Sequence, residues 1–473
     1  MIGLCLAILA AFAGTDPASS IDSVRLGAEA PAWMARPLDS LRGSPLTESV
    51  VRSALEEAVV RAESRGFLLA RASADSLDSA GILHLGAQAG RRFVWGGVRD
   101  RGTSRLRPDV LTRLSRIGSG VDADPRRMES ARSRILSSGY VEEASEPTIA
   151  QIPRTSAVRM VVDLRDLPSS YVEGAGGWSQ GEDASGAVDI HLADIAGTAR
   201  DLSFGISQGG ASLRANGTWK EPWIGPFDVA AIAHGELDQD SLSRRWSLSC
   251  DLEWSLADGL AELRTGMATS RSAEVTPGDS LFGPEVVEWS SRLGGGWRSA
   301  PPVPWPTHEA KVVLGLEAAL LSSDTGRSGR LRASGEADMR RSLGPAVLRL
   351  GGRGRTVWPL DKSVGSAESR AIGGIQLWRG WPEGSPRTPS WAQGITEVGI
   401  GNHRSGGVGA FFEPGTMARR NLDLTWSAVQ AWSAGTFATL LLPRWQVDLV
   451  ISVRDDTPRW NEALLSVRAI NRF

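Results

Sequence analysis

The chain has 473 residues, with 52 basic and 54 acidic side chains. This near-neutral balance argues against nucleic acid as the main partner, because a nucleic-acid-binding chain presents an excess of basic charge. Sixteen of the 18 tryptophans lie from Trp178 onward, so composition alone divides the chain into two parts.

The first 13 residues form an apolar run that ends in the small-residue pattern Ala11-Phe12-Ala13. Residues 1–13 are too few to span a membrane as a helix, and their ending is typical of a secretory signal peptide, although no Lys or Arg precedes the run. A short buried helix is the alternative interpretation. Cleavage would remove Cys5 and leave Cys250 without a partner for an intrachain disulfide. Since no later run of about 20 apolar residues predicts a transmembrane helix, an exported chain would be periplasmic, secreted or an outer-membrane β-barrel.

Residues 21–91 and 92–168 predict two small α/β modules of the same plan, which is an internal repeat. The predicted elements of the first module are a strand over 21–26, a helix that Ser44-Pro45 begins and Gly66 ends, and strands over 67–72 and 82–87. Those of the second are a strand at 93–95, helices over 108–114 and from Asp124-Pro125 to Gly139, and a closing strand over 158–164.

From residue 171 to residue 473 the apolar residues recur with period two instead of the helical period. A soluble sandwich also alternates in this way, so further features must decide. The polar face is densely charged, tryptophans bracket several strands as Trp246 and Trp254 do, and the alternating last strand ends on Phe473. Together these features favour a membrane barrel with a water-filled lumen.

About 11 strand-like runs precede the loop over 371–384 and about five follow it, which fits a 16-stranded barrel. The sequence therefore predicts a mainly β chain. Its C-terminal part, 171–473, is expected to form a 16-stranded transmembrane antiparallel β-barrel, preceded by the two small α/β domains.

The loop over 371–384 has five Gly or Pro residues among its 14 positions, yet it is too apolar to lie free in water. It carries Arg379, and a buried guanidinium needs carboxylate partners. Strand alternation turns Glu397 and Glu413 toward the lumen. We expect Arg379 to pair with Glu413, with Glu397 as the second acid. The alternative is that both acids are solvated lumen residues.

The stretch Gly205-Ile-Ser-Gln-Gly209 spells the G-x-S-x-G pattern of a hydrolase elbow. That pattern needs a strand, a turn and a helix, and no helix is predicted after it, so we expect Ser207 on a barrel strand. The sequence predicts no catalytic residue, no cofactor and no metal site.

Both small modules resemble the POTRA domain, the periplasmic module of the Omp85 superfamily. The resemblance is carried by Gly66-Phe67 and Gly139-Tyr140 after the long helices, by Gly90 before the second module, and by the closing stretch Val161–Leu164. The second copy matches well and the first loosely. A generic α/β domain is the alternative for each.

The barrel part resembles the same superfamily in two motifs and at its last residue. Gly373-Gly374 followed by Arg379-Gly380-Trp381 is similar to the motif of the sixth extracellular loop. Phe411–Gly415 is similar to the next signature, an aromatic-rich strand with an acid, where Glu413 replaces the usual Asp. Phe473 resembles the terminal aromatic by which such barrels are recognised for insertion, although Asn471 interrupts its face.

The resemblance implies a barrel in the bacterial outer membrane, with POTRA domains in the periplasm, that folds or translocates other polypeptides. Client strands would pair with free POTRA strand edges and with a weakly held seam between the last strand and a first strand rich in glycine at Gly174, Gly176 and Gly177. The implied partners are unfolded outer-membrane or secreted polypeptides, outer-membrane lipids and periplasmic accessory proteins, without nucleic acid.

Three functions stay open at this point. Assembly or insertion of membrane proteins, in the manner of the BamA and TamA branches, is favoured. A two-partner secretion transporter also has two POTRA modules, but it normally carries an N-terminal plug helix, and few residues separate the predicted signal from Ile21. A plain porin would explain the barrel but neither the repeat nor Arg379.

Overall fold

The computed structural model forms two compact units. The N-terminal unit comprises the chain up to Leu136 together with Val141–Asp166, and the barrel unit comprises Ser137–Tyr140 together with Leu167–Phe473. The predicted signal peptide, residues 1–13, lies outside the described residues. The structure describes residues 20–27, 31–78, 82–168, 170–178, 184–209, 212–240, 243–256, 261–274, 285–299, 308–323, 326–360, 369–372, 377–379, 381, 387–402, 406–421, 426–455 and 463–473.

The first module packs two helices on a three-stranded sheet of order β1-β3-β2, in which β1 runs parallel to β3. The helix α2 is capped by the Thr47 side chain, which accepts from the Val50 amide, and not by Ser44 as predicted. The helix α1 was not predicted, since Pro37 lies inside it. The elements are β1 (Ser23–Leu26), α1 (Ala32–Asp39), α2 (Glu48–Glu63), β2 (Arg71–Leu77) and β3 (Ile82–Gln88).

The second module repeats the parallel pairing of its first strand, β4, with a strand late in the module, β7, in a sheet of order β4-β7-β6. A separate antiparallel pair joins β5 and β8. The elements are β4 (Val94–Asp100), α3 (Pro108–Ser115), α4 (Arg127–Ser137), β5 (Val141–Ala144), β6 (Thr148–Gln151), β7 (Ala157–Val162) and β8 (Leu164–Asp166).

Gly66, which follows α2 in the first module, forms a close contact with the start of the second module. Its φ is +86°, its carbonyl accepts from the Phe93 amide at 2.7 Å, and a Cβ there would lie 2.4 Å from the Phe93 carbonyl oxygen. Beside it, Arg126 donates to both oxygens of Asp124 at 3.0 Å. Burial raises the pKa of Glu63 above its ordinary value, and the charge of Asp124 adds to the rise. The close approach of Gly66 to Phe93, together with its positive φ, therefore requires glycine at position 66.

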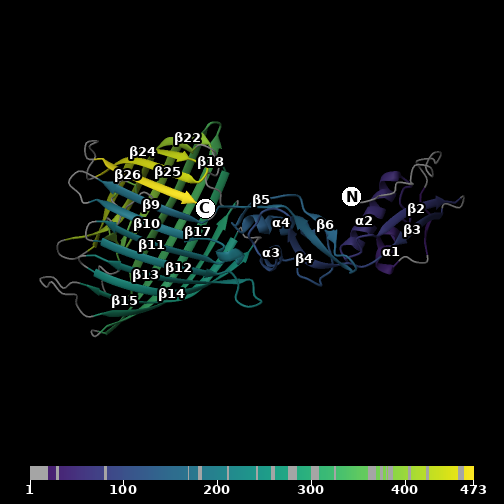
Figure 1. Cartoon of the computed structure of the whole chain (residues 1–473), viewed down its shortest axis with the longest axis horizontal. Coiled ribbons are helices and arrows are strands. Elements are labelled where there is room, and N and C mark those ends of the chain that lie inside the picture. Colours follow the sequence, from purple (N-terminus) through teal and green to yellow (C-terminus); the bar gives the residue numbers. More distant parts are fainter. Residues whose placement is uncertain are drawn as a thin grey trace. The chain divides into compact units, whose positions relative to one another are not determined.

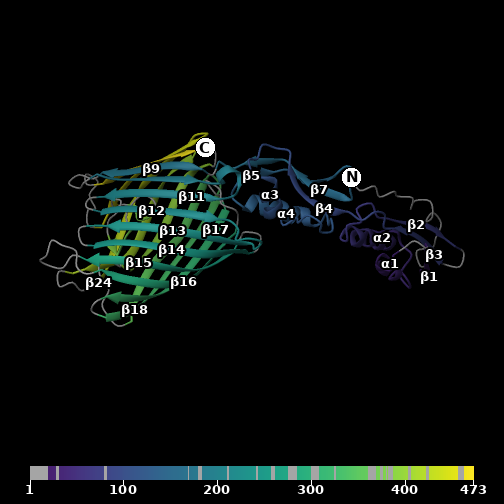
Figure 2. The same cartoon turned by 60° about the horizontal axis from the view of Figure 1, so that its bottom comes forward.

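The barrel closes on itself through antiparallel neighbours from β9 to β26, and Figures 1 and 2 show its strands side by side and strongly tilted. It has 16 strands, 11 before the loop and five after it, as predicted. They are β9 (Tyr171–Trp178), β10 (Ser185–Leu192), β11 (Asp201–Gly209), β12 (Ser212–Glu221), β13 (Val229–Gln239), β14 (Ser243–Leu256), β15 (Ala261–Glu274), β16 (Val286–Arg298), β17 (His308–Ser323), β18 (Gly326–Leu343), β19 (Ala346–Pro359), β22 (Trp391–Asn402), β23 (Gly406–Arg420), β24 (Trp426–Leu441), β25 (Trp445–Arg454) and β26 (Leu464–Arg472).

The barrel inverts the usual placement of polar and apolar groups. Apolar residues of the alternating faces point outward, and Leu314 and Met267 are 62% and 72% exposed. Charged residues point inward and are buried, among them Glu288, Arg332 and Glu413. An outer surface of this kind matches lipid, as expected for a membrane-spanning barrel. No helix in the described part of the chain is long and apolar enough to cross a membrane.

The strands are short near the closing seam and long on the opposite wall. β9 and β10 have 8 residues each, whereas β17 has 16 and β18 has 18. The seam ladder between β26 and β9 runs from Tyr171 to Trp178, the whole of β9, and the ladder between β9 and β10 runs from Tyr171 to Gly177. The length of the seam ladder therefore gives no reason to expect a weaker seam. Gly174 and Gly176 bring no side chains to it, and cross-strand side-chain pairs are what stabilise a sheet beyond its backbone.

Candidate functional site

The candidate site lies in the segment between β19 and β22, whose described residues 377–379 and 381 lie against the inner face of the barrel. Two short strands, β20 (Arg370–Ala371) and β21 (Arg387–Thr388), pair within it. Of the predicted motif, Arg379 and Trp381 are described, whereas Gly373, Gly374 and Gly380 lie outside the described residues.

Trp378 fixes the segment against the inner face of β23 and β24. Its side chain is fully buried and forms one apolar cluster with Ile372, Met417 and Ala431. Its amide donates to the Ile372 carbonyl at 3.0 Å, and its indole N–H donates to the Glu413 carbonyl at 3.2 Å. This apolar contact holds the segment inside the lumen and places the next residue, Arg379, beside the acids.

Arg379 meets both predicted acids. Its Nε lies 2.7 Å from Glu413 Oε1, and its backbone amide donates to Glu413 Oε2 at 2.9 Å. Its Nη1 lies 3.1 Å from Glu397 Oε2. The side chains of Arg379, Glu397 and Glu413 are 10%, 17% and 1% exposed. Glu413 therefore takes two hydrogen bonds from one residue, and charge-assisted bonds of this kind are the strong ones.

Neighbouring groups complete the environment of these charges. The guanidinium lies over the Phe411 ring at 3.8 Å from its centroid, and the Ser433 hydroxyl donates to Glu413 at 3.2 Å. Arg349 lies 3.7 Å from Glu397 and donates to Asp338 at 2.6 Å, so a second arginine and a third acid extend the cluster. Because the charges are paired and desolvated, removing one of them would leave a partner uncompensated in a low-dielectric site.

Two further contacts of the segment were not predicted from the sequence. Arg353 donates from Nη2 to the carbonyl of Leu377, and from Nε to Gln393 at 2.8 Å. Arg454 lies over the Trp381 ring at 4.7 Å. Both arginines alternate with other residues on ordinary barrel strands, so the sequence gives no local signal that either reaches the segment.

The seam carries a second arginine–acid cluster. Arg468 of β26 donates to both carboxylate oxygens of Glu173 in β9, at 2.6 and 2.8 Å. Asp448 of β25 lies 3.5 Å from the same guanidinium. The last residue, Phe473, donates its amide to the Ser170 carbonyl at 2.9 Å and is half-exposed. Its role as a recognition signal stays a prediction.

Ser207 lies inside β11, where it pairs with Arg214 of β12. The strand-turn-helix setting of a hydrolase elbow is therefore not found around it. In the part of the chain that the structure describes, no group of three or more His, Cys, Asp or Glu side chains is arranged to hold a metal ion.

The whole described architecture is similar to solved outer-membrane proteins. BamA from Haemophilus ducreyi lacking POTRA domains 1–3 matches 96% of this chain and 100% of its own, with 13% identity and a TM-score of 0.57. CdiB from Escherichia coli matches 99% of this chain and 93% of its own, with 12% identity and a TM-score of 0.60. CdiB from Acinetobacter baumannii matches 97% and 91%, with 12% identity and a TM-score of 0.56.

No family model and no curated protein sequence matches the chain. Its fold is nevertheless that of these solved structures, with small α/β modules followed by a closed 16-stranded antiparallel barrel. BamA and CdiB resemble this chain in fold to a similar degree.

Proposed function

We propose that the chain is an outer-membrane protein of the Omp85 type that folds and inserts, or translocates, other polypeptides. The observation that carries the proposal is Arg379, which the segment after β19 brings into the lumen between Glu397 and Glu413. A plain pore has no need of a loop fixed inside its lumen by desolvated charges. The two α/β modules, which we assign to residues 21–91 and 92–168, give the chain a periplasmic client-binding part.

Free strand edges support binding of an unfolded client. In the second module β6 lies at one edge of the sheet, and all four of its residues, Thr148–Gln151, are exposed. An edge strand offers unpaired N–H and C=O groups along its open side, so an extended client segment can add to it as another strand. The seam between β9 and β26 offers a second place where a client strand could pair.

A two-partner secretion transporter is the second candidate, and the likeness to CdiB in fold favours it as much as the likeness to BamA favours assembly. The two functions differ in what happens to the client. An assembly factor leaves the client as a barrel in the same membrane, whereas a transporter releases it on the other side.

Reconstitution of the full chain in lipid vesicles tests the proposal. The probe is a urea-unfolded eight-stranded barrel protein, and its folding is followed by heat-modifiable mobility on gels. We expect the wild-type chain to speed this folding, deletion of residues 92–168 to abolish the effect, and Ser207→Ala to leave it unchanged. A deletion variant that is as fast as wild type contradicts the role of the second module.

Substitutions in β6 refine the test, because alternate residues of an edge strand point their N–H groups toward the sheet and toward its open side. Proline at Ile149 or at Ala150 removes the backbone N–H group of that residue. In one of the two variants the lost N–H group faces the open edge, and in the other it faces β7. We expect only the variant that loses the open-edge N–H group to fold normally and yet fail to bind the client. Equal client binding by both folded variants rules out β6 as the binding edge.

Location has a separate test. The chain should sediment with the outer membrane and migrate differently on gels before and after boiling. A monomer that stays soluble without detergent contradicts the membrane assignment, because the apolar outer face would then have no matching solvent.

A further inference from the structure

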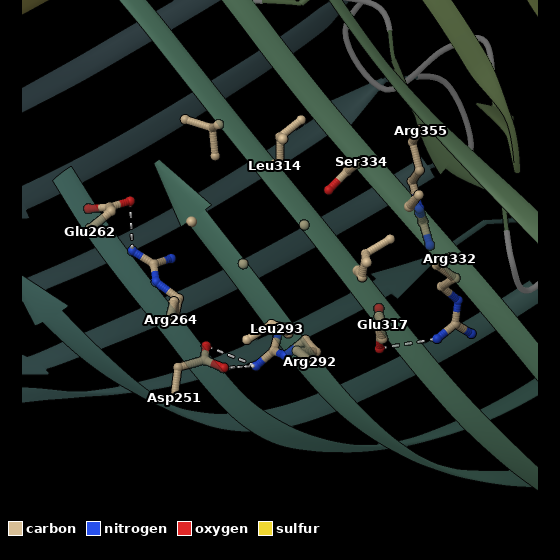
Figure 3. A pocket seen from close by; sticks show the side chains of 16 residues that line it. Asp251, Glu262, Arg264, Arg292, Leu293, Leu314, Glu317, Arg332, Ser334 and Arg355 are labelled. Atoms are coloured by element: carbon tan, nitrogen blue, oxygen red, sulfur yellow. Dashed lines mark hydrogen bonds and ion pairs between the residues drawn. The ribbon is translucent and has the colours of Figure 1, made fainter. Parts of the chain in front are cut away.

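A recess of about 310 Å³ opens on the inner wall of the barrel between β14 and β19. It is separate from the Arg379 segment, whose described residues do not line it. Figure 3 shows it from close by, with Arg264 and Glu262 at one side and Arg355 and Ser334 at the other.

One cross-strand row of residues forms the floor of this recess. Arg264 of β15 pairs in register with Gly294 of β16, Gly294 with Gly315 of β17, Gly315 with Ser334 of β18, and Ser334 with Arg355 of β19. We call this row of five residues the trough. Adjacent strands lie about 4.8 Å apart, so the trough is about 19 Å long, with small residues between two arginines.

The backbone does not require glycine at the two central positions. Neither Gly294 nor Gly315 has a positive φ. A Cβ at Gly315 would meet the Ser334 hydroxyl at 2.9 Å, and a Cβ at Gly294 would meet the Leu314 carbonyl at 3.1 Å. The first of these contacts is relieved by rotating one hydroxyl. Glycine inside a strand marks places where a ligand or another backbone approaches closely, and here it keeps the floor open.

The next row of residues forms a fixed, charged wall beside the floor. Arg292 donates from Nη2 to both oxygens of Asp251 at 2.9 Å, and Arg332 lies 3.1 Å from Glu317. Figure 3 draws both pairs. Side chains that are held by ion pairs lose little freedom when a ligand arrives, so the recess is preorganised.

Two guanidinium groups on the rim keep donors for a ligand. The side chains of Arg264 and Arg292 are 42% and 30% exposed. Among the described residues both bind their present partners through Nη2, Arg264 to Glu253 and Arg292 to Asp251, so Nη1 of each keeps its N–H donors. A guanidinium carries five N–H donors in a planar fork that matches a carboxylate, so both groups can bind an anionic oxygen in addition to their present partners.

The lining residues also define the chemical class of the ligand. They include four arginines and three acids, namely Asp251, Glu262 and Glu317. Arg264 and Arg332 also bind Glu253 and Glu288, but those two acids have further cationic partners in Lys220 and Arg245, so an excess of one positive charge remains. The leucines that line the recess are more than half exposed on the outer face, so they contribute backbone to it. A polar recess of this kind suits a peptide with a carboxylate and does not suit an acyl chain.

We propose that the trough binds a short extended segment of polypeptide that carries an acidic side chain, with its carboxylate on Arg264 and Arg292 and its backbone over Gly294 and Gly315. At about 3.3 Å per residue, the trough accommodates about six extended residues. The inference rests on the proposed function for the source of the segment, a client polypeptide. Binding itself is a property of the folded barrel and can be measured without client assembly.

The test uses the purified full chain, folded in detergent micelles, and a fluorescent peptide of alternating Gly and Glu with blocked ends. Its control is the same peptide with Gln in place of Glu. Fluorescence anisotropy should show at least about ten-fold tighter binding of the Glu peptide, as expected for a charge-assisted hydrogen bond. Arg292→Gln should remove this preference, and Arg271→Gln, on the outer face beside Trp246, should keep it.

Two variants of one residue probe the trough without touching its ion pairs. Ser334→Phe fills the floor and should weaken binding of the Glu peptide about ten-fold or more, whereas Ser334→Ala should bind as wild type does. Heat-modifiable mobility checks that each variant is folded. Equal binding of the Glu and Gln peptides, or full binding by folded Ser334→Phe, overturns the inference.

Inorganic phosphate serves as a competitor that distinguishes a polypeptide site from a site for any anion. If phosphate binds as tightly as the Glu peptide and Ser334→Phe affects neither, the trough is a simple anion site and the polypeptide assignment is wrong. A barrel that binds no peptide but still speeds folding of the unfolded probe contradicts this inference and leaves the proposed function standing.

Discussion

The Arg379 segment and the seam each contain an arginine that pairs with a buried glutamate. The two arginines differ in the backbone that carries them. Arg379 meets Glu413 at 2.7 Å, and Arg468 meets Glu173 at 2.6 Å. The side chains of the two glutamates are 1% and 4% exposed, and each arginine reaches a second acid. Arg468, however, belongs to a strand with ladders on both sides, whereas Arg379 belongs to the segment that connects β19 to β22.

This difference decides what each ion pair does. A strand in a closed barrel keeps its place through backbone hydrogen bonds, so the pair at the seam adds to an arrangement that already exists. The described residues around Arg379, 377–379 and 381, form no such ladder with the barrel wall, and each of their hydrogen bonds to the wall has a side chain at one end. We therefore expect similar substitutions to release the segment at one site and to change little at the other.

The largest effect is expected for Arg379→Glu, because three acids would then converge on one buried site. Arg379→Ala removes the partner of two buried carboxylates, and such a loss costs about 3–5 kcal/mol. In both variants the segment should leave the lumen and become sensitive to protease added outside. Arg271→Ala on the outer face is the control. An Arg379→Ala barrel that resists protease and assembles clients as wild type does removes the basis of the proposed function.

The charge swap Arg379→Glu with Glu413→Arg should recover part of the protease resistance that Arg379→Glu loses. The swap restores attraction, but it does not restore the fork geometry or the bond from Ser433, so rescue should be incomplete. Heat-modifiable mobility and protease protection measure it. No rescue at all points to a role for Arg379 outside the pair with Glu413.

A smaller effect is expected when both partners at the seam become neutral amides. Arg468→Gln with Glu173→Gln leaves no uncompensated charge between those two residues, and we expect a loss of about 1 kcal/mol or less. The matched variant, Arg379→Gln with Glu413→Gln, should release its segment. Comparing the gel-shift temperatures and protease patterns of the two double variants tests the comparison directly, and equal behaviour refutes it.

The smallest effect is expected at the junction of the two α/β modules, where water reaches the charges. Burial raises the pKa of Glu63, so the folded junction holds its proton more tightly than the unfolded chain does. This contribution is complete below the ordinary pKa and is lost as pH rises through the raised value. Hydrogen exchange at the Phe93 amide, corrected for its intrinsic rate, should show protection falling with pH, and Glu63→Gln should show no such fall.

The architecture of the barrel could be predicted from the sequence because period two is a local signal. Leu316 and Val398, for example, each stand next to a glutamate in the sequence, and the structure turns both outward. The short helix α1 was missed since Pro37 interrupts its pattern, and the start of α2 was placed too early because Ser44-Pro45 is also a good cap. Strand β2 begins at Arg71, and the predicted run from residue 67 starts with a turn.

The site was predictable only as far as its charges were. A buried Arg379 needs carboxylate partners, and the alternation of apolar and polar residues along the strands indicated Glu397 and Glu413 as lumen-facing acids. The donation from Arg353 to the Leu377 carbonyl could not be foreseen, because a backbone acceptor has no sequence signature. The trough was likewise hidden, since it depends on the register of five strands and not on any one stretch of sequence.

The seam also determines when the barrel can close during folding. Glu173 and Arg468 are 295 positions apart in the chain, yet they form the contact that completes the circle. Joining ends so far apart is slow, because the entropy of closing a long loop must be overcome before the contact forms. During synthesis and export, β9 is therefore one of the first barrel strands to appear and one of the last to gain both neighbours. Until β26 arrives, its open edge is exposed to any other strand nearby, so this protein must itself pass through the state in which a partner strand can be captured.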